Sequence, residues 1–308
     1  MITKHPSPLR YPGGKTSLAP LLTEVVKIND LGGGVYIEPF AGGAGAALKL
    51  LLAEQVSEIY INDLDKKIYS FWMAILNQTD DFIRLLRSTP ITVWQWRKQK
   101  AILKEPGKHS RLEVGFATFY LNRCNRSGVL NGGPIGGINQ DGNYKIDARF
   151  NKKELQQRIE KIALYRDRIT VKNLDGIAFL NWIFSNRTVD AANSLIYMDP
   201  PYFKKASSLY DVYFRDSDHR KLADYLKQRR PFRWIVSYDD TALIKRLYKD
   251  RRHVLLMQYS AHTVRLGREL VIFSSNCQLP RNFLDARSNK SLITATNNKT
   301  KHRPTCSI

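Results

Sequence analysis

Apolar and polar residues along the chain follow two alternating patterns, one typical of strands and one typical of helices. Short runs rich in β-branched and aromatic residues predict seven strands, at residues 35–38, 58–63, 169–172, 194–198, 234–237, 253–259 and 269–273. Apolar residues at helical spacing predict helices at residues 18–28, 46–53, 66–76, 177–184, 218–228 and 241–248. Such alternation is typical of an α/β fold with a largely parallel sheet. No helix separates the last two strands, so we expect them to form an antiparallel pair.

Residues 81–165 interrupt this alternation. They predict helices at 82–86, 93–103, 112–121 and 152–165, with many basic residues between the apolar positions. A glycine-rich stretch with a turn signal at Gln140-Asp141-Gly142-Asn143 predicts a hairpin over residues 129–146. We therefore expect a discontinuous catalytic domain, residues 1–80 and 166–278, with residues 81–165 inserted into it. The basic, polar residues 279–308 are predicted to form a disordered tail.

Candidate binding chemistry first appears at the end of the first predicted strand. Glu38 is followed by Pro39-Phe40-Ala41-Gly42-Gly43 and then by a predicted helix. Glycines let the backbone approach a ligand closely, and the start of a helix offers free N–H groups. The next strand ends at Asp63, the position where dinucleotide-type folds carry the acid that binds ribose hydroxyls. The alternative for the glycine turn alone is tight packing between strand and helix.

A second candidate site follows the fourth predicted strand, at Asp199-Pro200-Pro201-Tyr202. Prolines cannot continue a sheet ladder, so this strand ends in a carboxylate, stiff carbonyls and an aromatic ring. An exocyclic base amine is a poor nucleophile because its lone pair is delocalised, and acceptors on its hydrogens would favour the reactive form. The ring could stack on a base flipped out of a duplex. The alternative is a plain turn that closes the strand.

Composition and charge narrow the class of partner. The formal net charge is +21 and the isoelectric point is about 9.9, which favours a polyanionic partner, with nucleic acid ahead of an anionic membrane. Three widely spaced cysteines indicate a reducing, cytoplasmic compartment, and the six histidines form no metal-binding motif. No apolar run predicts a membrane span. Gly14-Lys15-Thr16 is similar to the end of a phosphate-binding loop, but Leu9 occupies the required glycine position, so we reject an NTPase.

The motifs together resemble the Dam-like (D12 class) family of adenine-N6 DNA methyltransferases. The matching stretches lie in the family's order, from about residue 9 to residue 275. They are Leu9-Arg10-Tyr11-Pro12-Gly13-Gly14-Lys15, Glu38-Pro39-Phe40-Ala41-Gly42-Gly43-Ala44-Gly45, Asn62-Asp63, Leu121-Asn122-Arg123, Asp199-Pro200-Pro201-Tyr202 and Glu269-Leu270-Val271-Ile272.

The resemblance implies a Rossmann-like, seven-stranded domain that uses S-adenosylmethionine, with residues 81–165 as a helical and hairpin-bearing target-recognition insertion. The catalytic residues it implies are Asp199, Pro200, Pro201 and Tyr202. The cofactor-binding residues it implies are Tyr11, Lys15, Glu38, Pro39, Phe40, Ala41, Gly42, Gly43, Asp63 and Asp199. The substrate it implies is a flipped adenine in double-stranded DNA, methylated in a site-specific way in the cytoplasm, on the nucleoid. It leaves open whether a cognate restriction endonuclease is a partner.

The predicted DNA-binding residues lie near the glycine-rich stretch. They are Asn122, Arg123, Arg126, Ser127 and Asn131. Family members that methylate within GATC typically carry Asn-Gly-Leu followed two residues later by Arg, whereas this chain has Ser127-Gly128-Val129-Leu130-Asn131. Arginine reads guanine and asparagine favours adenine, so if Asn131 faces a base, GATC is not the expected sequence. The remaining alternatives are a non-catalytic DNA-binding member of the fold and an RNA methyltransferase.

Overall fold

The structure is a computed structural model that describes residues 5–10, 15–185, 189–201, 214–228, 232–249, 252–260, 264–278 and 280. For residues 252–260 and 264–268 only the backbone is described. Two predicted site residues, Tyr11 and Tyr202, lie outside the described residues, as does nearly all of the predicted tail.

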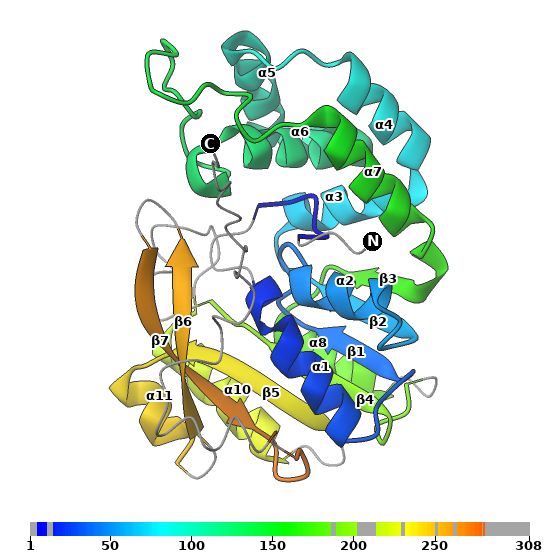
Figure 1. Cartoon of the computed structure of the whole chain (residues 1–308), viewed down its shortest axis with the longest axis vertical. Coiled ribbons are helices and arrows are strands. Elements are labelled where there is room, and N and C mark those ends of the chain that lie inside the picture. The colour runs from blue at the N-terminus through cyan, green and yellow to red at the C-terminus, as the bar shows by residue number, and fades with distance from the viewer. Residues whose placement is uncertain are drawn as a thin grey trace, which may run out of the picture.

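A single seven-stranded sheet forms the centre of the molecule (Figure 1). Its order is β3-β2-β1-β4-β5-β7-β6, with β1 to β5 parallel and β7 antiparallel to both β5 and β6. The strands are β1 Val35–Glu38, β2 Glu58–Asn62, β3 Ile169–Lys172, β4 Ser194–Met198, β5 Arg233–Asp239, β6 Arg252–Ser260 and β7 Val264–Phe273. The predicted α/β fold with an antiparallel last pair is confirmed.

Helices cover both faces of the sheet, as a parallel sheet requires. Along β4 every residue is buried, and successive side chains enter two different apolar clusters: Leu195 and Tyr197 one, Ile196 and Met198 the other. The first cluster is completed by α1 Ala19–Ile28, α2 Gly45–Leu52 and α3 Lys66–Asn77. The second is completed by α8 Gly176–Ser185, α10 Asp216–Gln228 and α11 Ala242–Leu247.

The strand order reverses at the pair β1 and β4. From β1 the chain moves outward through β2 to β3, and it then returns to place β4 on the other side of β1. Open α/β sheets bind ligands at such a switch point, at the carboxyl ends of the strands. The topology therefore points to the segments after Glu38 and after Met198.

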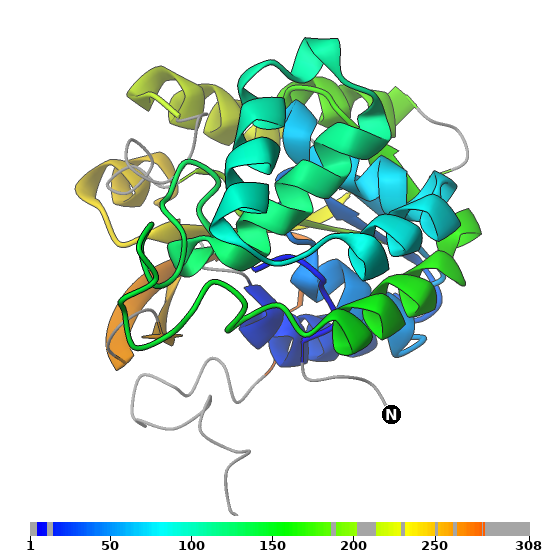
Figure 2. The same cartoon turned by 90° about the horizontal axis from the view of Figure 1, so that it is seen from above.

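Four helices between α3 and β3 form a group at one end of the molecule (Figure 1), and they lie in front of the sheet in the view from above (Figure 2). They are α4 Thr79–Ser88, α5 Val93–Lys104, α6 Arg111–Cys124 and α7 Lys152–Ala163. α6 packs closely on α3, because Gly115 leaves room for the backbone of Ser70, which a Cβ atom would meet at 2.6 Å. The stacked rings of Phe71 and Phe119 join the two helices.

The hairpin predicted over residues 129–146 is wrong. The described chain there consists of turns, and the one bridge at this loop is isolated and joins Asn125 to Pro134. The side chain of Gln140 replaces a ladder: it donates to the carbonyls of Ile135 and Gly137 and accepts from the N–H of Ile146. Gly136 and Gly137 have positive φ angles of 85° and 78°, which bend the chain out of extended geometry.

None of the helices among the described residues has the length and apolar character needed to cross a membrane. The described residues also contain no group of three or more His, Cys, Asp or Glu side chains arranged to hold a metal ion.

Candidate active site

Asp199 comes directly after β4, at the switch point of the sheet. Its side chain is 24% exposed. Its Oδ1 atom accepts a hydrogen bond from Ser237 Oγ at 2.9 Å and lies 3.3 Å from Lys15 Nζ. These two contacts come from β5 and from the 3₁₀ turn Lys15–Leu18, so two separate elements fix the orientation of the carboxylate.

Buried groups in turn hold both partners of Asp199. Tyr197 contacts Ser237 Oγ at 2.8 Å, and because the serine hydrogen goes to Asp199, the tyrosine is the donor. Lys15 Nζ lies 2.9 Å from Glu269 Oε1 on β7. Burial lowers the pKa of Lys15, but Asp199 and Glu269 outweigh it and leave the pKa above its usual value. The lysine is therefore a charged bridge between two carboxylates.

The second group of site residues follows β1. Glu38 is buried, and its Oε1 accepts from the Tyr36 hydroxyl at 2.9 Å and from the Ala47 N–H at 3.2 Å. Burial raises the pKa of Glu38 to about 8, against the effect of these two bonds, and the charge of Asp199 adds to the rise. Glu38 and Asp199 therefore interact electrostatically across the switch point.

The glycine turn after Glu38 is fastened to the end of β2. The Gly42 N–H donates to Asp63 Oδ2 at 2.9 Å, and Asp63 Oδ1 accepts from the Asp65 N–H at 2.9 Å. Asn62 adds a bond to the Pro39 carbonyl at 2.9 Å. Gly42 has a φ of 47°, a conformation that favours glycine. Burial raises the pKa of Asp63 to about 7, although part of its surface is exposed.

Phe40 extends the turn towards α8 and α10. Its ring lies so close to Gly176 that a Cβ atom there would meet it at 2.5 Å. Its other neighbour is Phe214, edge to face with the ring centroids 5.5 Å apart. Phe214 contacts His219, and His219 contacts Tyr238 of β5. An aromatic series therefore borders the acidic groups.

The predicted cofactor residues that are described lie on the ends of neighbouring strands. Glu38 ends β1 and the turn 39–43 follows it, Asp63 follows β2, and Asp199 follows β4 and forms an ion pair with Lys15. Carboxylates accept from ribose hydroxyls and attract a sulfonium or ammonium cation. The residues present therefore fit S-adenosylmethionine in chemistry, and the glycine turn leaves its backbone accessible.

Asn122 of α6 holds two segments of the chain together. Its Oδ1 accepts from the Arg10 N–H at 2.6 Å, and its Nδ2 donates to the carbonyls of Arg10 and Gly128 at 2.7 and 2.9 Å. The side chain is 1% exposed. A buried amide with these partners cannot reach DNA, so the predicted DNA contact of Asn122 is corrected to a positioning role.

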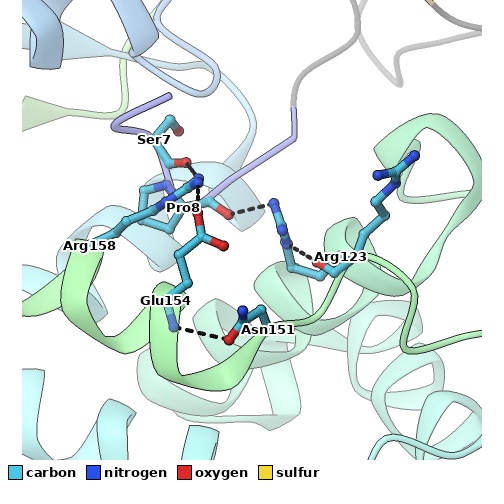
Figure 3. A network of polar contacts seen from close by, with 7 residues as sticks. Ser7, Pro8, Arg123, Asn151, Glu154 and Arg158 are labelled. Atoms are coloured by element: carbon cyan, nitrogen blue, oxygen red, sulfur yellow. Dashed lines mark hydrogen bonds and ion pairs between the residues drawn. The ribbon is translucent and has the colours of Figure 1, made fainter. Parts of the chain in front are cut away.

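Arg123 and Arg158 fasten the same N-terminal segment to α6 and α7 (Figure 3). Arg123 donates to the carbonyls of Pro8 at 3.4 Å and of Arg149 at 2.7 Å. Arg158 donates to the Ser7 carbonyl at 3.0 Å and pairs with Glu154. This network ties the segment that leads to Lys15 to the inserted helices.

The other three predicted DNA-binding residues are exposed. Arg126, Ser127 and Asn131 lie on the turn that follows α6. Ser127 has a φ of 56°, and Gly128 packs so tightly that a Cβ atom would meet the Arg10 carbonyl at 2.4 Å. The turn is therefore built against the N-terminal segment, with these three side chains outside.

Sequence reasoning missed Ser237, Tyr197 and the contact of Glu269 with Lys15. Ser237 directly follows the apolar run Trp234-Ile235-Val236, Glu269 directly precedes the apolar run from Leu270 to Phe273, and both are buried. A polar residue next to an apolar run of a strand is the signal that could have identified them.

The sequence matches the model of the family described as D12 class N6 adenine-specific DNA methyltransferase, over residues 11–264. A search of curated proteins finds no match.

Among solved structures, a candidate RNA methyltransferase, PH1948, from Pyrococcus horikoshii is 13% identical, with 86% of each chain covered and a TM-score of 0.39. TrmK of M. capricolum, in complex with S-adenosyl-homocysteine, is 8% identical, covers 81% of this chain and 66% of its own, and gives a TM-score of 0.35. The rRNA methyltransferase aviRa from Streptomyces viridochromogenes is 12% identical, with 86% of each chain covered and a TM-score of 0.34. On the family match, which spans most of its length, the chain belongs to the D12 class of N6 adenine-specific, S-adenosylmethionine-dependent DNA methyltransferases.

Proposed function

We propose that this chain methylates the N6 amine of an adenine that is flipped out of a specific site in double-stranded DNA. The observation that carries the proposal is the carboxylate of Asp199, which lies at the switch point of the sheet and is held through Oδ1 by Lys15 and Ser237. A carboxylate fixed in this way can accept from an amine in one defined orientation.

In this proposal Asp199 and the carbonyl of Pro200 accept the hydrogens of the adenine amine. Two acceptors localise the nitrogen lone pair and stabilise the positive charge that develops on nitrogen during attack. Holding the amine in line with the electrophile supplies the orientation contribution to the rate. Pro201 stiffens the turn, and Tyr202 stacks on the flipped base.

The cofactor-binding residues in this proposal are Lys15, Glu38, the turn 39–43, Asp63 and Asp199, together with Tyr11. When bound, S-adenosylmethionine supplies the electrophilic methyl group. Asp63 accepts from the ribose hydroxyls, and the carboxylate of Asp199 favours a positively charged sulfonium over its neutral product. Phe40 packs against Gly176 of α8 beside these residues.

DNA recognition is assigned to residues 81–165. This segment has 16 Lys and Arg against 7 Asp and Glu, a net charge of +9. Arg126, Ser127 and Asn131 form the part that faces DNA, with asparagine suited to adenine. Asn122 and Arg123 position that turn, although Arg123 also retains donors for a phosphate. A DNA enzyme of this kind acts on the nucleoid in the cytoplasm, alone or beside a restriction endonuclease.

Methyl transfer from labelled S-adenosylmethionine to duplex DNA tests the proposal. Wild-type protein and Asp224→Ala, an exposed position on α10, should label adenine N6, whereas Asp199→Ala should not. The proposal fails if wild-type protein binds the cofactor and DNA without transferring a methyl group. Preferential labelling of a structured RNA competitor would instead support the RNA methyltransferase alternative.

A further inference from the structure

Glu269 of β7 lies directly before a run of apolar residues. Its neighbours Leu270, Val271 and Ile272 are buried core residues, and Glu269 itself is 1% exposed. Burying a carboxylate without a cationic partner is strongly unfavourable, so this residue requires one. Its described partner is Lys15, at 2.9 Å.

Lys15 is buried as well, and it contacts a second carboxylate. Its Nζ lies 3.3 Å from Asp199, which is longer than its distance to Glu269. Glu269 on β7 is therefore the closer of the two carboxylates to the Lys15 ammonium, and Asp199 is the more distant one.

We propose that Glu269 is a positioning residue for methyl transfer, which holds the Lys15 ammonium so that it orients Asp199 without neutralising it. The inference rests on the proposed function of Asp199. It adds a role for a residue that touches neither the amine nor the cofactor and acts through Lys15.

The geometry explains why a shared lysine is needed. Both described contacts of Asp199, with Lys15 and with Ser237, fall on Oδ1, which fixes the rotation of the carboxylate. If Glu269 lost its charge, the ammonium would move fully onto Asp199. An Asp199 carboxylate that is fully paired with the lysine is a weaker hydrogen-bond acceptor for the adenine amine. The amine would therefore be held less firmly in line with the methyl group.

The acids that interact electrostatically with Lys15 are Asp199, which follows β4, and Glu269 of β7. Asp199 interacts in turn with titratable groups of three strands: Tyr36 and Glu38 of β1, Tyr197 of β4 and Tyr238 of β5. Burial lowers the pKa of Lys15 and the two bonded acids raise it. Without the charge of Glu269, one of the two acids that raise the pKa of Lys15 is lost, so this pKa falls relative to that of the wild type.

The test compares wild-type protein with Glu269→Gln, which keeps the shape of the side chain and removes its charge. NMR titration of isotope-labelled lysine, assigned with Lys15→Arg, should show Lys15 losing its proton at a lower pH in the variant than in the wild type. The variant's kcat should fall roughly 10- to 100-fold, with the KM for S-adenosylmethionine within about 3-fold of wild type. The pH profile of kcat should acquire a basic limb at the titration midpoint of Lys15.

Glu58→Gln is the matched control, since Glu58 lies at the start of β2, where it accepts from Tyr60. It should leave both the lysine titration and kcat unchanged. If Glu269→Gln does not fold, Glu269→Asp takes its place: it keeps the charge but shortens the reach, so kcat should fall while Lys15 stays protonated.

Three results would overturn the inference: an unchanged Lys15 titration in Glu269→Gln, an unchanged kcat and pH profile, or wild-type kcat in Glu269→Asp when Glu269→Gln is unfolded. An inactive wild-type protein would instead refute the proposed function. The lysine titration is measured without substrates, so it still decides whether Glu269 holds the ammonium.

Discussion

Burial sets the ionisation of the acids at the site. Glu38 and Asp63 both have raised pKa values, about 8 and about 7, because each is largely removed from water. Asp199 instead has contacts from Lys15 and Ser237. These three acids lie on neighbouring strand ends, but their surroundings differ, and different surroundings suit acids to different roles.

Glu38 should make the protein less stable as the pH rises. The unfolded chain releases this proton near pH 4.5 and the folded chain near pH 8, so the folded state binds more protons between these values. The free energy of unfolding should fall across that window and level off above it. Glu38→Gln should reduce the slope without abolishing it, since Asp63 titrates in the same window with the same sign. Urea unfolding at several pH values measures this, and parallel profiles of variant and wild type would contradict it.

Asp63 should make cofactor binding depend on pH in the opposite direction. The ionised carboxylate accepts hydroxyl hydrogens better than the neutral acid, so S-adenosylmethionine should bind more tightly as the pH rises through about 7. Asp63→Asn should weaken binding about 10- to 100-fold and remove this dependence. Calorimetric titration at pH values on either side of 7 tests both, with Asp224→Asn as the control. Equal affinity of wild type and Asp63→Asn would contradict the assignment.

Helices and strands were predictable wherever the apolar periodicity decides the structure. Each of the seven strands lies where its apolar run predicts, because the sheet buries both faces. α4 and α6 extend beyond their predicted ends, and in α6 a capping box of Ser110 and Glu113 sets the start. The hairpin was not predictable in the same way, since Gln140 closes that loop through its side chain.

Site residues were predictable where a functional side chain lies at the end of a strand. Glu38 is the last residue of its strand, Asp63 and Asp199 follow theirs directly, and the topology brings those ends side by side. The contacts of Lys15 with Glu269 and of Asp199 with Ser237 join residues distant in the chain, and they depend on the three-dimensional packing. Asn122 illustrates the same limit, because its motif is visible in the sequence and its burial is not.

Asn122 should matter for the stability of the insertion more than for contacts with DNA. Asn122→Ala removes three hydrogen bonds from buried or partly buried backbone groups of Arg10 and Gly128, which should cost about 2–4 kcal/mol of unfolding free energy. Arg126→Ala, at an exposed position, should change stability by less than about 0.5 kcal/mol. Thermal and urea unfolding measure the stability of both variants. Equal effects at the two positions would contradict the positioning role of Asn122.

At the scale of the whole molecule, the charge of +21 should dominate DNA affinity. Binding to non-specific duplex should weaken steeply between about 50 and 200 mM salt, because counterions are released from the phosphates. Arg126→Ala should lower the slope of log affinity against log salt by about 1 if this side chain meets a phosphate. Lys227→Ala, on the exposed side of α10, should leave the slope unchanged. Fluorescence anisotropy at several salt concentrations gives these slopes, and a shallow wild-type slope would contradict an electrostatic interface.

The most direct measurement is a map of N6-methyladenine in the DNA of cells that express the protein. Wild-type protein should modify the adenine of one short sequence at nearly every occurrence, and Asp199→Ala, expressed at the same level, should modify none. That map also reads the recognition sequence, for which Asn131 favours a site other than GATC. Absence of N6-methyladenine in cells with folded wild-type protein, or equal modification by Asp199→Ala, would contradict the account.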